Sequence, residues 1–286
     1  MQSTQIDQQE FRAVQRSHWN EASKAWREWS EFIDHSTAVV SERLVVMAGV
    51  QPGHRVLDVA AGYGEPSLTA ARTVGAQGEV VATDISAGML EYGRERAAAA
   101  QLQNVRFIES DAASLDFPPG SFDAALSRWG IIFEPDGEDA AARVRSFLKP
   151  GARMAISSWG PPERVPFMAL PMATVMKLLE VPPPPPGTPG PMSRPTPAAI
   201  GGLLEGGGFS DIEVDELEVT FEYDSAEEFT RSVQALAPPI TNLVKPHPDE
   251  VQQQVWQAVT DSAREHASDD GSVHLTNLVL VAAGRA

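Results

Sequence analysis

The fold of this chain is decided by the stretch Arg55-Val-Leu-Asp-Val-Ala-Ala-Gly-Tyr-Gly-Glu-Pro66, followed after a short helical pattern by Glu79-Val-Val-Ala-Thr-Asp84. Residues 56–60 form a mainly apolar run, as in strands buried on both faces of a parallel sheet. Gly62 and Gly64 carry no side chain, so a ligand can approach the backbone there. Asp84 follows at about the spacing at which nucleotide-binding βαβ units hold a ribose hydroxyl. The stretch therefore predicts strand, turn, helix and strand around a nucleoside half-site.

The residues around the turn also bear on which nucleoside is bound. A dinucleotide site needs G-x-G-x-x-G facing a pyrophosphate, but the first glycine position is Ala60 and the third falls on Ser67 if the pattern starts at Gly62. Asp58 and Glu65 would repel a pyrophosphate and favour a positively charged ligand. S-adenosylmethionine has a ribose, a sulfonium and an ammonium group, and no phosphate. The carboxylates favour this cofactor over NAD; a structural βαβ unit without a ligand is the alternative.

Composition narrows the class of protein. The chain has 286 residues and a formal net charge of −17. Such a surface repels phosphate backbones, so nucleic acid is not expected as a partner. A small molecule is the expected partner. Cysteine is absent, which excludes disulfides and thiolate metal sites, and we expect no metal. No apolar run approaches a membrane span, and the polar start Met1–Asp7 lacks the features of a signal peptide. We expect a cytoplasmic protein and leave a homodimer open.

Residues 8–48 have a helical pattern, in which Trp19, Trp26 and Trp29 recur at three- and seven-residue spacing and a second pattern runs from Thr37 to Met47. An amphipathic helix packed on the domain explains most of these residues. The tryptophan stripe is also suited to closing a ligand site. We expect residues 1–50 to form an N-terminal helical cap.

Strands and helices alternate from residue 55 to residue 160, which predicts an α/β, Rossmann-like fold with a parallel sheet and helices on both faces. Ligands of such sheets bind at the carboxyl ends of the strands. The expected strand ends are Ala60–Gly64, Asp84–Ile85, Ser110–Ala112, Ser127–Trp129 and Ser158–Trp159. Polar and aromatic side chains gather at these ends.

Residues 161–197 change in character, because this segment holds 13 of the 23 prolines. It includes a short methionine-rich helical pattern with Met168, Met172 and Met176 at four-residue spacing. A stiff polyproline linker beside a packing helix is one reading. We favour a lid over residues 161–195, because the segment leaves directly from the end of the fifth strand. The main domain is then expected over residues 51–160 and 196–286.

Five blocks together resemble class I S-adenosylmethionine-dependent methyltransferases, and within them the branch of ubiquinone/menaquinone C-methyltransferases. The blocks cover about residues 50–160 in order, and Gly206–Phe221 with the last strand resembles the family's final hairpin. They are Val56–Gly64, Ala82–Ser86, Ser110–Ala112 with Leu115 and Phe117–Pro118, Phe122–Leu126, and Leu148–Gly151. The resemblance implies a seven-stranded sheet of order 3-2-1-4-5-7-6 with the seventh strand antiparallel.

The resemblance also implies roles for individual residues. The methionine end of the cofactor would lie against Asp58, Ala60, Gly62, Gly64 and Ser127. The ribose would bind Asp84, and the adenine would lie against Ile85, Met89, Asp111 and Ala112. Trp26 of the cap is a further candidate contact. The chain departs from the family's usual glycine at Ala60.

Methyl transfer from a sulfonium is an in-line displacement, which needs alignment and exclusion of water rather than a fixed catalytic triad. No catalytic residue is therefore assigned; His18, His35, Arg128 and Glu134 are candidates for a base or an anchor. The expected acceptor is a small apolar or aromatic molecule, methylated at carbon or oxygen. The candidate acceptor contacts are Trp19, Arg128, Trp129, Phe133, Trp159, Met168 and Met172. An amine N-methyltransferase, an NAD-dependent enzyme and a non-catalytic binding protein are the alternatives.

Overall fold

Seven strands form one sheet in the order β3-β2-β1-β4-β5-β7-β6 in the computed structural model, which describes residues 8–183, 185 and 188–286. β7 is antiparallel to both β5 and β6, and the other pairings are parallel. The expected fold class and strand order are confirmed. The strands are β1 (Arg55–Val59), β2 (Glu79–Asp84), β3 (Val105–Glu109), β4 (Phe122–Arg128), β5 (Leu148–Trp159), β6 (Ser210–Tyr223) and β7 (Val273–Arg285).

β1 lies at the centre of the parallel part, where Leu57 is in register with Val81 of β2 and with Ala125 of β4. Its residues from Val56 to Val59 are all buried. Because successive side chains of a strand point to opposite faces, Val56 joins the core with α2 and α3, while Leu57 joins the core with α5 and α7. A strand covered on both faces explains the apolar run of the sequence.

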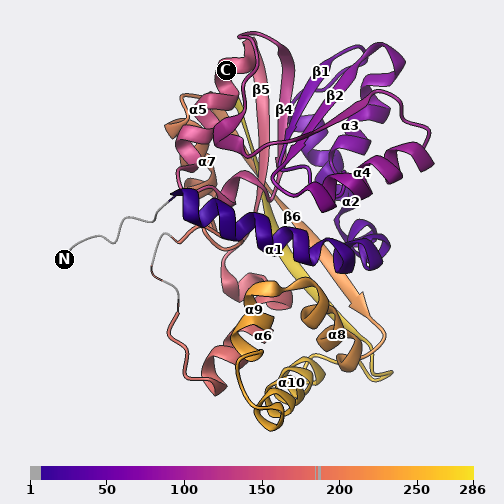
Figure 1. The fold of residues 1–286 in the computed structure, drawn as a ribbon, viewed down its shortest axis with the longest axis vertical. Helices are drawn as coiled ribbons and strands as arrows, with labels where there is room; N and C mark the ends of the chain where they lie inside the picture. Colours follow the sequence, from indigo (N-terminus) through magenta and orange to yellow (C-terminus); the bar gives the residue numbers. More distant parts are fainter. Residues whose placement is uncertain (1–7, 184, 186–187) are drawn as a thin grey trace, which may run out of the picture.

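The helices cover both faces and extend beyond the carboxyl edge of the sheet (Figure 1). Ser86, Thr196 and Ser225 cap three of these helices, since each side chain accepts a hydrogen bond from the backbone N–H three residues later. The α-helices are α1 (Gln8–Glu28), α2 (Ser30–Met47), α3 (Ser67–Val74), α4 (Ala87–Ala99), α5 (Gly137–Phe147), α6 (Pro166–Leu178), α7 (Pro197–Gly206), α8 (Ala226–Leu236), α9 (Pro238–Val244) and α10 (Asp249–Arg264). The 3-10 helices are η1 (Gly75–Gln77), η2 (Ala112–Ser114), η3 (Ile131–Phe133) and η4 (Pro162–Arg164).

The N-terminal segment forms two helices with different surroundings. α2 starts at Ser30, earlier than the pattern from Thr37 indicated, and packs on β4, β5, β6 and β7. α1 crosses the carboxyl edge of the sheet instead, as the indigo ribbon in Figure 1 shows, and contacts α4 and α8. No helix in the described part of the chain is long and apolar enough to cross a membrane.

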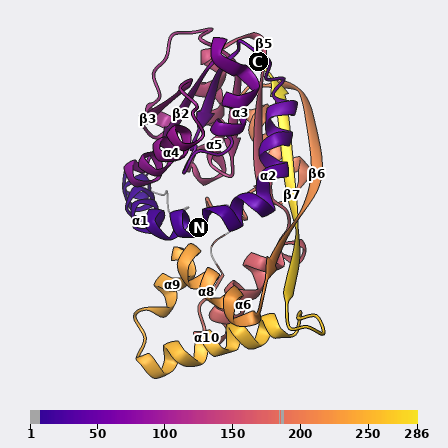
Figure 2. The ribbon, with the colours of Figure 1, turned by 90° about the vertical axis from the view of Figure 1, so that its right-hand side faces the viewer.

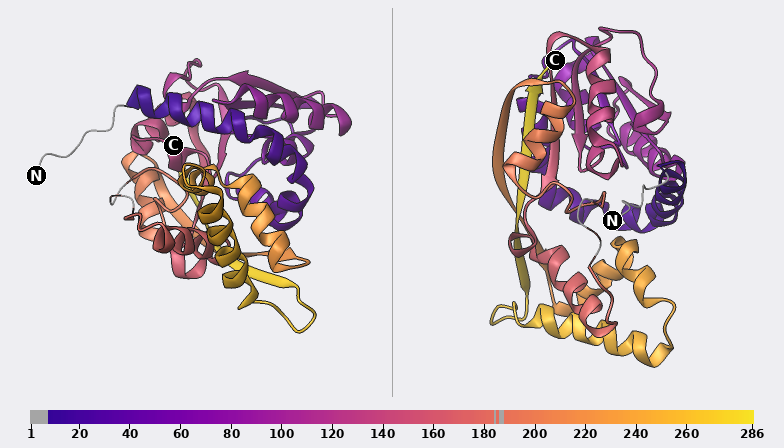
Figure 3. Two further views of the ribbon diagram at one scale, coloured as in Figure 1. Left: turned by 60° about the horizontal axis from the view of Figure 1, so that its bottom comes forward. Right: turned by 90° about the vertical axis from the view of Figure 1, so that its left-hand side faces the viewer.

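A second layer of helices lies beyond the carboxyl edge. β6 and β7 are longer than the parallel strands β1 to β4 and continue to α10, as Figures 2 and 3 show. α10 packs on α6 and α8, and α9 contacts the same two helices. The methionine-rich helix α6 is therefore one member of a layer that also contains α8, α9 and α10. We call α6, α8, α9 and α10 the outer helical layer.

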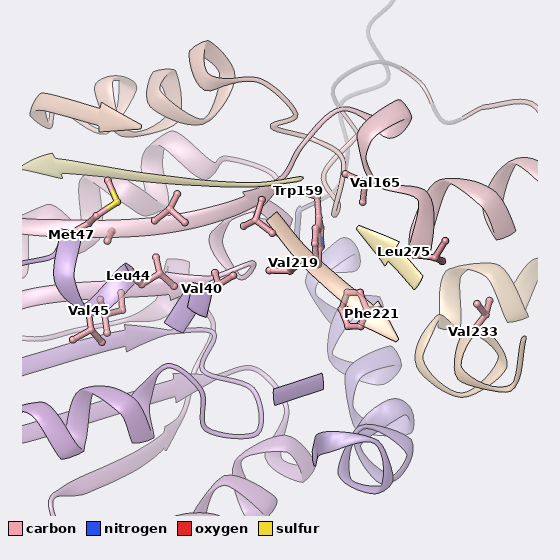
Figure 4. Packing of buried hydrophobic residues seen from close by; sticks show 14 of the residues in the cluster. Val40, Leu44, Val45, Met47, Trp159, Val165, Val219, Phe221, Val233 and Leu275 are labelled. Atoms are coloured by element: carbon pink, nitrogen blue, oxygen red, sulfur yellow. The ribbon is translucent and has the colours of Figure 1, made fainter. Parts of the chain in front are cut away.

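One hydrophobic cluster connects this layer with the sheet. It includes Leu44 of α2, Trp159 of β5 and Phe221 of β6, and reaches Val233 of α8 and Val259 of α10 (Figure 4). Among the described residues, the outer helical layer and the core under α2 thus share one hydrophobic cluster. Apolar burial of this extent is the main stabilising contribution to such a fold.

Asn277 of β7 joins the outer helical layer to the sheet through hydrogen bonds. Its side chain is fully buried, and its Oδ1 accepts from the Phe167 N–H in the first turn of α6 at 3.0 Å. Its Nδ2 donates to the carbonyls of Leu275 at 2.6 Å and Val219 at 3.4 Å. A buried amide with both ends paired in this way fixes where α6 begins.

Asn277→Ala should lower the free energy of unfolding by about 1–3 kcal/mol, because the Phe167 N–H loses its buried partner. Urea unfolding followed by circular dichroism measures the change. Thr276→Ala is the matched control, since the neighbouring Thr276 side chain is exposed and contacts Thr220 at the surface. Equal losses in the two variants would contradict a specific role of Asn277.

Candidate functional site

The glycine turn between β1 and α3 lies beside the end of β2. The Ala61 N–H donates to the Thr83 carbonyl at 2.8 Å, and the Gly62 N–H donates to Asp84 Oδ2 at 2.8 Å. Both glycines have positive φ, 54° at Gly62 and 113° at Gly64. An ideal Cβ placed on Gly62 would meet no atom within 4 Å. The turn therefore offers open backbone next to a carboxylate.

Asp84 is held from two sides, because its Oδ1 accepts from the Ser86 N–H at 2.8 Å while Oδ2 accepts from Gly62. The side chain is 7% exposed. Burial raises the pKa of Asp84 to about 6, and the backbone donors oppose that rise. Asp84 therefore lies at the end of β2, beside the glycine turn.

Asp58 of β1 lies below the same turn and is completely buried. Its Oδ2 accepts from Ser67 Oγ at 2.5 Å, while Oδ1 is a buried oxygen without a hydrogen-bond partner. Burial raises the pKa of Asp58 to about 7, with the Ser67 hydrogen bond and the charge of Arg128 opposing it. An orphaned carboxylate oxygen is costly unless a ligand or a positive charge completes it.

The ends of β1 and β4 approach each other very closely at Ala60 and Gly130. A Cβ built on Gly130 would lie 2.4 Å from the Ala60 Cβ. Ala60 has φ 59° and Trp129 has φ 51°, a region that side chains disfavour. Ser127 joins the two ends, since its hydroxyl donates to the Val59 carbonyl and accepts from the Ile131 N–H. These hydrogen bonds occupy the Ser127 hydroxyl within the protein.

Arg128 is directed toward α2, because it shares the face of β4 that carries Ala124 and Leu126. Its Nη1 donates to Thr37 Oγ1 and Ser41 Oγ, each at 3.1 Å, and its Nη2 donates to the Tyr63 hydroxyl at 3.1 Å. The side chain is buried. These contacts give Arg128 a structural role, whether or not it also meets a substrate.

α1 is hydrogen-bonded to the segments that follow β4 and β2, the two strands on either side of β1. Arg12 Nε donates to Glu134 Oε2 at 3.1 Å in the loop after β4. Asn20 Oδ1 accepts from Ser86 Oγ at 2.8 Å and from the Gly88 N–H at 3.2 Å at the start of α4. Burial raises the pKa of Glu134, and Arg12 opposes this. The helix thus bridges two strand ends that flank the glycine turn.

An aromatic row runs over the ends of β4 and β5 into the outer helical layer. The rings of Trp129 and Trp159 are stacked with centroids 4.5 Å apart and an interplanar angle of 11°. Phe167 of α6 lies 4.9 Å from Trp159 and 4.6 Å from Phe221 of β6. We call Trp129, Trp159, Phe167 and Phe221 the aromatic row. Trp129 and Phe167 are partly exposed.

The other residues predicted for the site differ in their contacts and in their burial. Near the strand ends, Trp19 contacts Trp26 and Phe133, each with ring centroids 5.7 Å apart. Met89 is buried against α1, and Asp111 caps η2 by accepting from Ser114. His35 is exposed on α2. The partly buried residues among the predictions also include His18, Ile85, Met168 and Met172, whereas Ala112 is buried.

Several residues of this region were not predicted from the sequence. Tyr63 lies inside the glycine turn and could have been noticed there. Arg12, Asn20 and Phe167 carry no motif, and only the packing of α1 and α6 brings them to the strand ends. Among the described residues, no group of three or more His, Asp or Glu side chains is arranged to hold a metal ion.

Comparisons with known proteins agree with this geometry. Residues 56–151 match the family model described as "Methyltransferase domain". The ubiquinone/menaquinone biosynthesis C-methyltransferase UbiE of Teredinibacter turnerae is 37% identical over 120 residues, which cover 42% of this chain and 48% of that protein. The chain thus matches about half the length of these curated relatives.

Two solved structures share the fold. YcgJ from Bacillus subtilis has a TM-score of 0.55 and 19% identity, covering 88% of this chain and 97% of the other. Phosphoethanolamine N-methyltransferase 2 of Haemonchus contortus, in complex with phosphomonomethylethanolamine and S-adenosylhomocysteine, has a TM-score of 0.52 and 19% identity, covering 85% and 52%. Residues 56–151 thus match a methyltransferase domain, the chain is similar there to the ubiquinone/menaquinone C-methyltransferases, and it shares its fold with these solved structures.

Proposed function

We propose that this protein transfers a methyl group from S-adenosylmethionine to a small apolar or aromatic molecule, at carbon or oxygen. The observation that carries the choice of acceptor is the aromatic row, which begins at the end of β4, where β4 meets β1 at Ala60 and Gly130. An aromatic platform beside a cofactor turn favours planar or apolar ligands. The matched methyltransferase domain supports the reaction class.

The residues at the turn fit this cofactor. Gly62 leaves open space beside its backbone, and Asp84 stands where a ribose is held in βαβ sites. The unpartnered Oδ1 of Asp58 suits a ligand that brings positive charge. When bound, S-adenosylmethionine supplies an activated methyl group on a sulfonium. We assign Asp84 to the ribose hydroxyls and Asp58 to the charged methionine end.

The protein's contribution to the reaction is alignment and exclusion of water. Trp129 and Phe167, the partly exposed members of the aromatic row, would hold the acceptor against the strand ends, with Trp159 and Phe221 buried behind them. Trp19 with Phe133 would close the site from the side of α1. Glu134 is engaged by Arg12 and is therefore a poor candidate for a free base. His18 of α1 stays a candidate, because it is partly exposed on the helix that crosses the strand ends.

The competing readings differ in their support. The matched methyltransferase domain and the similarity to C-methyltransferases support a methyltransferase over an NAD-dependent enzyme. An N-methyltransferase of a small amine would use the same cofactor site and differ only in its acceptor. A non-catalytic binding protein would bind the cofactor without turnover.

Asp84→Ala should weaken the binding of S-adenosylmethionine by roughly 10- to 100-fold, the equivalent of a charge-assisted hydrogen bond of about 1.5–3 kcal/mol. Isothermal titration calorimetry measures the dissociation constant, with circular dichroism as a check on folding. Asp123→Ala is the matched control, because Asp123 lies at the amino end of β4, where it accepts from Arg55 and Lys149. Unchanged affinity in Asp84→Ala would refute the ribose role.

Cofactor affinity should also depend on pH. Burial raises the pKa values of Asp58 and Asp84 to about 7 and about 6, from an ordinary value of 3.8. The unliganded fold therefore binds extra protons, and its stability falls as pH rises from about 4 to about 7. A cationic ligand prefers the ionised carboxylates, so affinity should rise about tenfold between pH 5.5 and 7.5.

Calorimetry across this pH range checks the dependence. Adenosine, which carries neither positive group, should show a smaller change, and Asp58→Asn should flatten the profile for S-adenosylmethionine. An affinity that stays constant from pH 5.5 to 7.5 would contradict the assignment of Asp58.

Turnover tests the choice of acceptor. Incubation with S-adenosylmethionine should yield S-adenosylhomocysteine with planar phenols or quinols, and less with small aliphatic amines, because the aromatic row favours planar ligands. Mass spectrometry of both products measures this. Preference for amines would favour the N-methyltransferase reading, and cofactor binding without turnover on any acceptor would favour the non-catalytic one.

A further inference from the structure

Tyr63 stands between Gly62 and Gly64, yet its side chain is directed into the protein. Tyr63 is only 3% exposed. A turn that binds a ligand through its backbone does not by itself require a buried phenol at this position. The Tyr63 ring belongs to the small cluster with Ala22 of α1 and Met89 of α4. The glycine turn therefore has a large anchor on the side away from the open backbone at Gly62.

The Tyr63 hydroxyl joins two other elements. It donates to Asp34 Oδ1 of α2 at 2.9 Å and accepts from Arg128 Nη2 of β4 at 3.1 Å. Burial raises the pKa of Tyr63, so the phenol stays neutral and keeps its proton for Asp34. Both hydrogen bonds involve a charged group and are stronger than neutral ones.

The Tyr63 ring and carbonyl add contacts to α4 and α1. The Arg96 guanidinium lies 4.9 Å from the ring centroid and donates from Nη1 to the Tyr63 carbonyl at 3.1 Å. Arg96 also pairs with Asp34, which closes a ring of interactions around the phenol. Trp26 of α1 lies 5.8 Å from the same ring. Elements α1, α2, α4 and β4 thus all meet on one residue.

This anchor reaches the cofactor site through the main chain. Gly62 precedes Tyr63, and its N–H donates to Asp84 Oδ2. The position of Tyr63 therefore sets the position of that N–H and, through it, of the Asp84 carboxylate. A turn held in advance binds its ligand with a smaller loss of conformational entropy.

We infer that Tyr63 is a positioning residue, which holds the glycine turn for S-adenosylmethionine and couples cofactor binding to the packing of α1 and α2. This inference rests on the proposed function. Removal of the hydroxyl leaves Arg128 Nη2 and Asp34 Oδ1 each without one partner, and the turn loses its direct hydrogen bond to α2 while the indirect connection through Arg96 stays.

The test compares Tyr63→Phe with Tyr92→Phe. Tyr92→Phe is the matched control, because it also removes a hydroxyl with a part-buried hydrogen bond, here to Ser30 Oγ at 2.8 Å. Tyr92 belongs to α4 and lies outside the glycine turn. Calorimetry with S-adenosylhomocysteine should give a dissociation constant raised about tenfold in Tyr63→Phe and within about twofold of wild type in Tyr92→Phe. Melting temperatures of the unliganded proteins separate stability from binding.

Turnover adds a readout that loss of stability alone would not move. In Tyr63→Phe, KM for S-adenosylmethionine should rise while kcat stays close to wild type, because the aromatic row and the acceptor contacts are untouched. If Tyr63→Phe does not fold, Asp34→Asn replaces it, since the amide still accepts from Tyr63 but without charge; a dissociation constant raised about threefold is then expected.

Two results would overturn the inference. One is a wild-type dissociation constant for S-adenosylhomocysteine in Tyr63→Phe, or in Asp34→Asn where that variant replaces it. The other is an equal weakening in Tyr92→Phe, which would assign the effect to general packing under α1. A wild-type protein that binds neither S-adenosylmethionine nor S-adenosylhomocysteine would overturn the proposed function itself.

Discussion

The arrangement of the strand ends depends on one buried positive charge. The Arg128 guanidinium lies inside the protein at the end of β4, where an unpaired charge would cost several kcal/mol. Hydroxyls of α2 and of Tyr63 accept its hydrogen bonds, and the carboxylates of Glu65 and Asp34 lower the cost further. Because these partners come from separate elements, pairing Arg128 requires α2, β4 and the glycine turn to come together.

Steric constraint acts at the same place. Ala60 and Trp129 have left-handed backbone, and Gly130 has no room for a side chain against Ala60. Backbone strain of this kind is maintained when the surrounding structure determines it, and it is frequent at functional sites. Here it allows β1 and β4 to end side by side, with the glycine turn on one side and the aromatic row beginning on the other. The cofactor and acceptor regions of the proposed site are adjacent for this reason.

The sequence predicted what local patterns can encode. The strand–turn–helix–strand unit around Asp84 was confirmed, because it depends on residues close in the chain. The strand order followed from resemblance rather than from periodicity. Residues 8–48 were predicted to be helical, but the boundary between α1 and α2 lies at Trp29, before the pattern from Thr37 begins.

Long-range contacts were not predictable in the same way. Arg12 and Glu134 are 122 residues apart, and no spacing rule connects them. The outer helical layer was foreseen only as a methionine-rich lid, because its other helices lie after β6 in the sequence and pack on α6 only in three dimensions. The cofactor residues stay predictions from family resemblance, supported by the geometry at the turn.

The hydrophobic cluster that runs from α2 to α10 has a consequence for cooperativity. A layer joined to a domain through a polar interface can unfold on its own, but one that shares a continuous core cannot separate without exposing that core. Val259 of α10 and Leu44 of α2 belong to the same cluster. The proposed acceptor region therefore unfolds in the same transition as the proposed cofactor region, and substitutions there act on the stability of the whole fold.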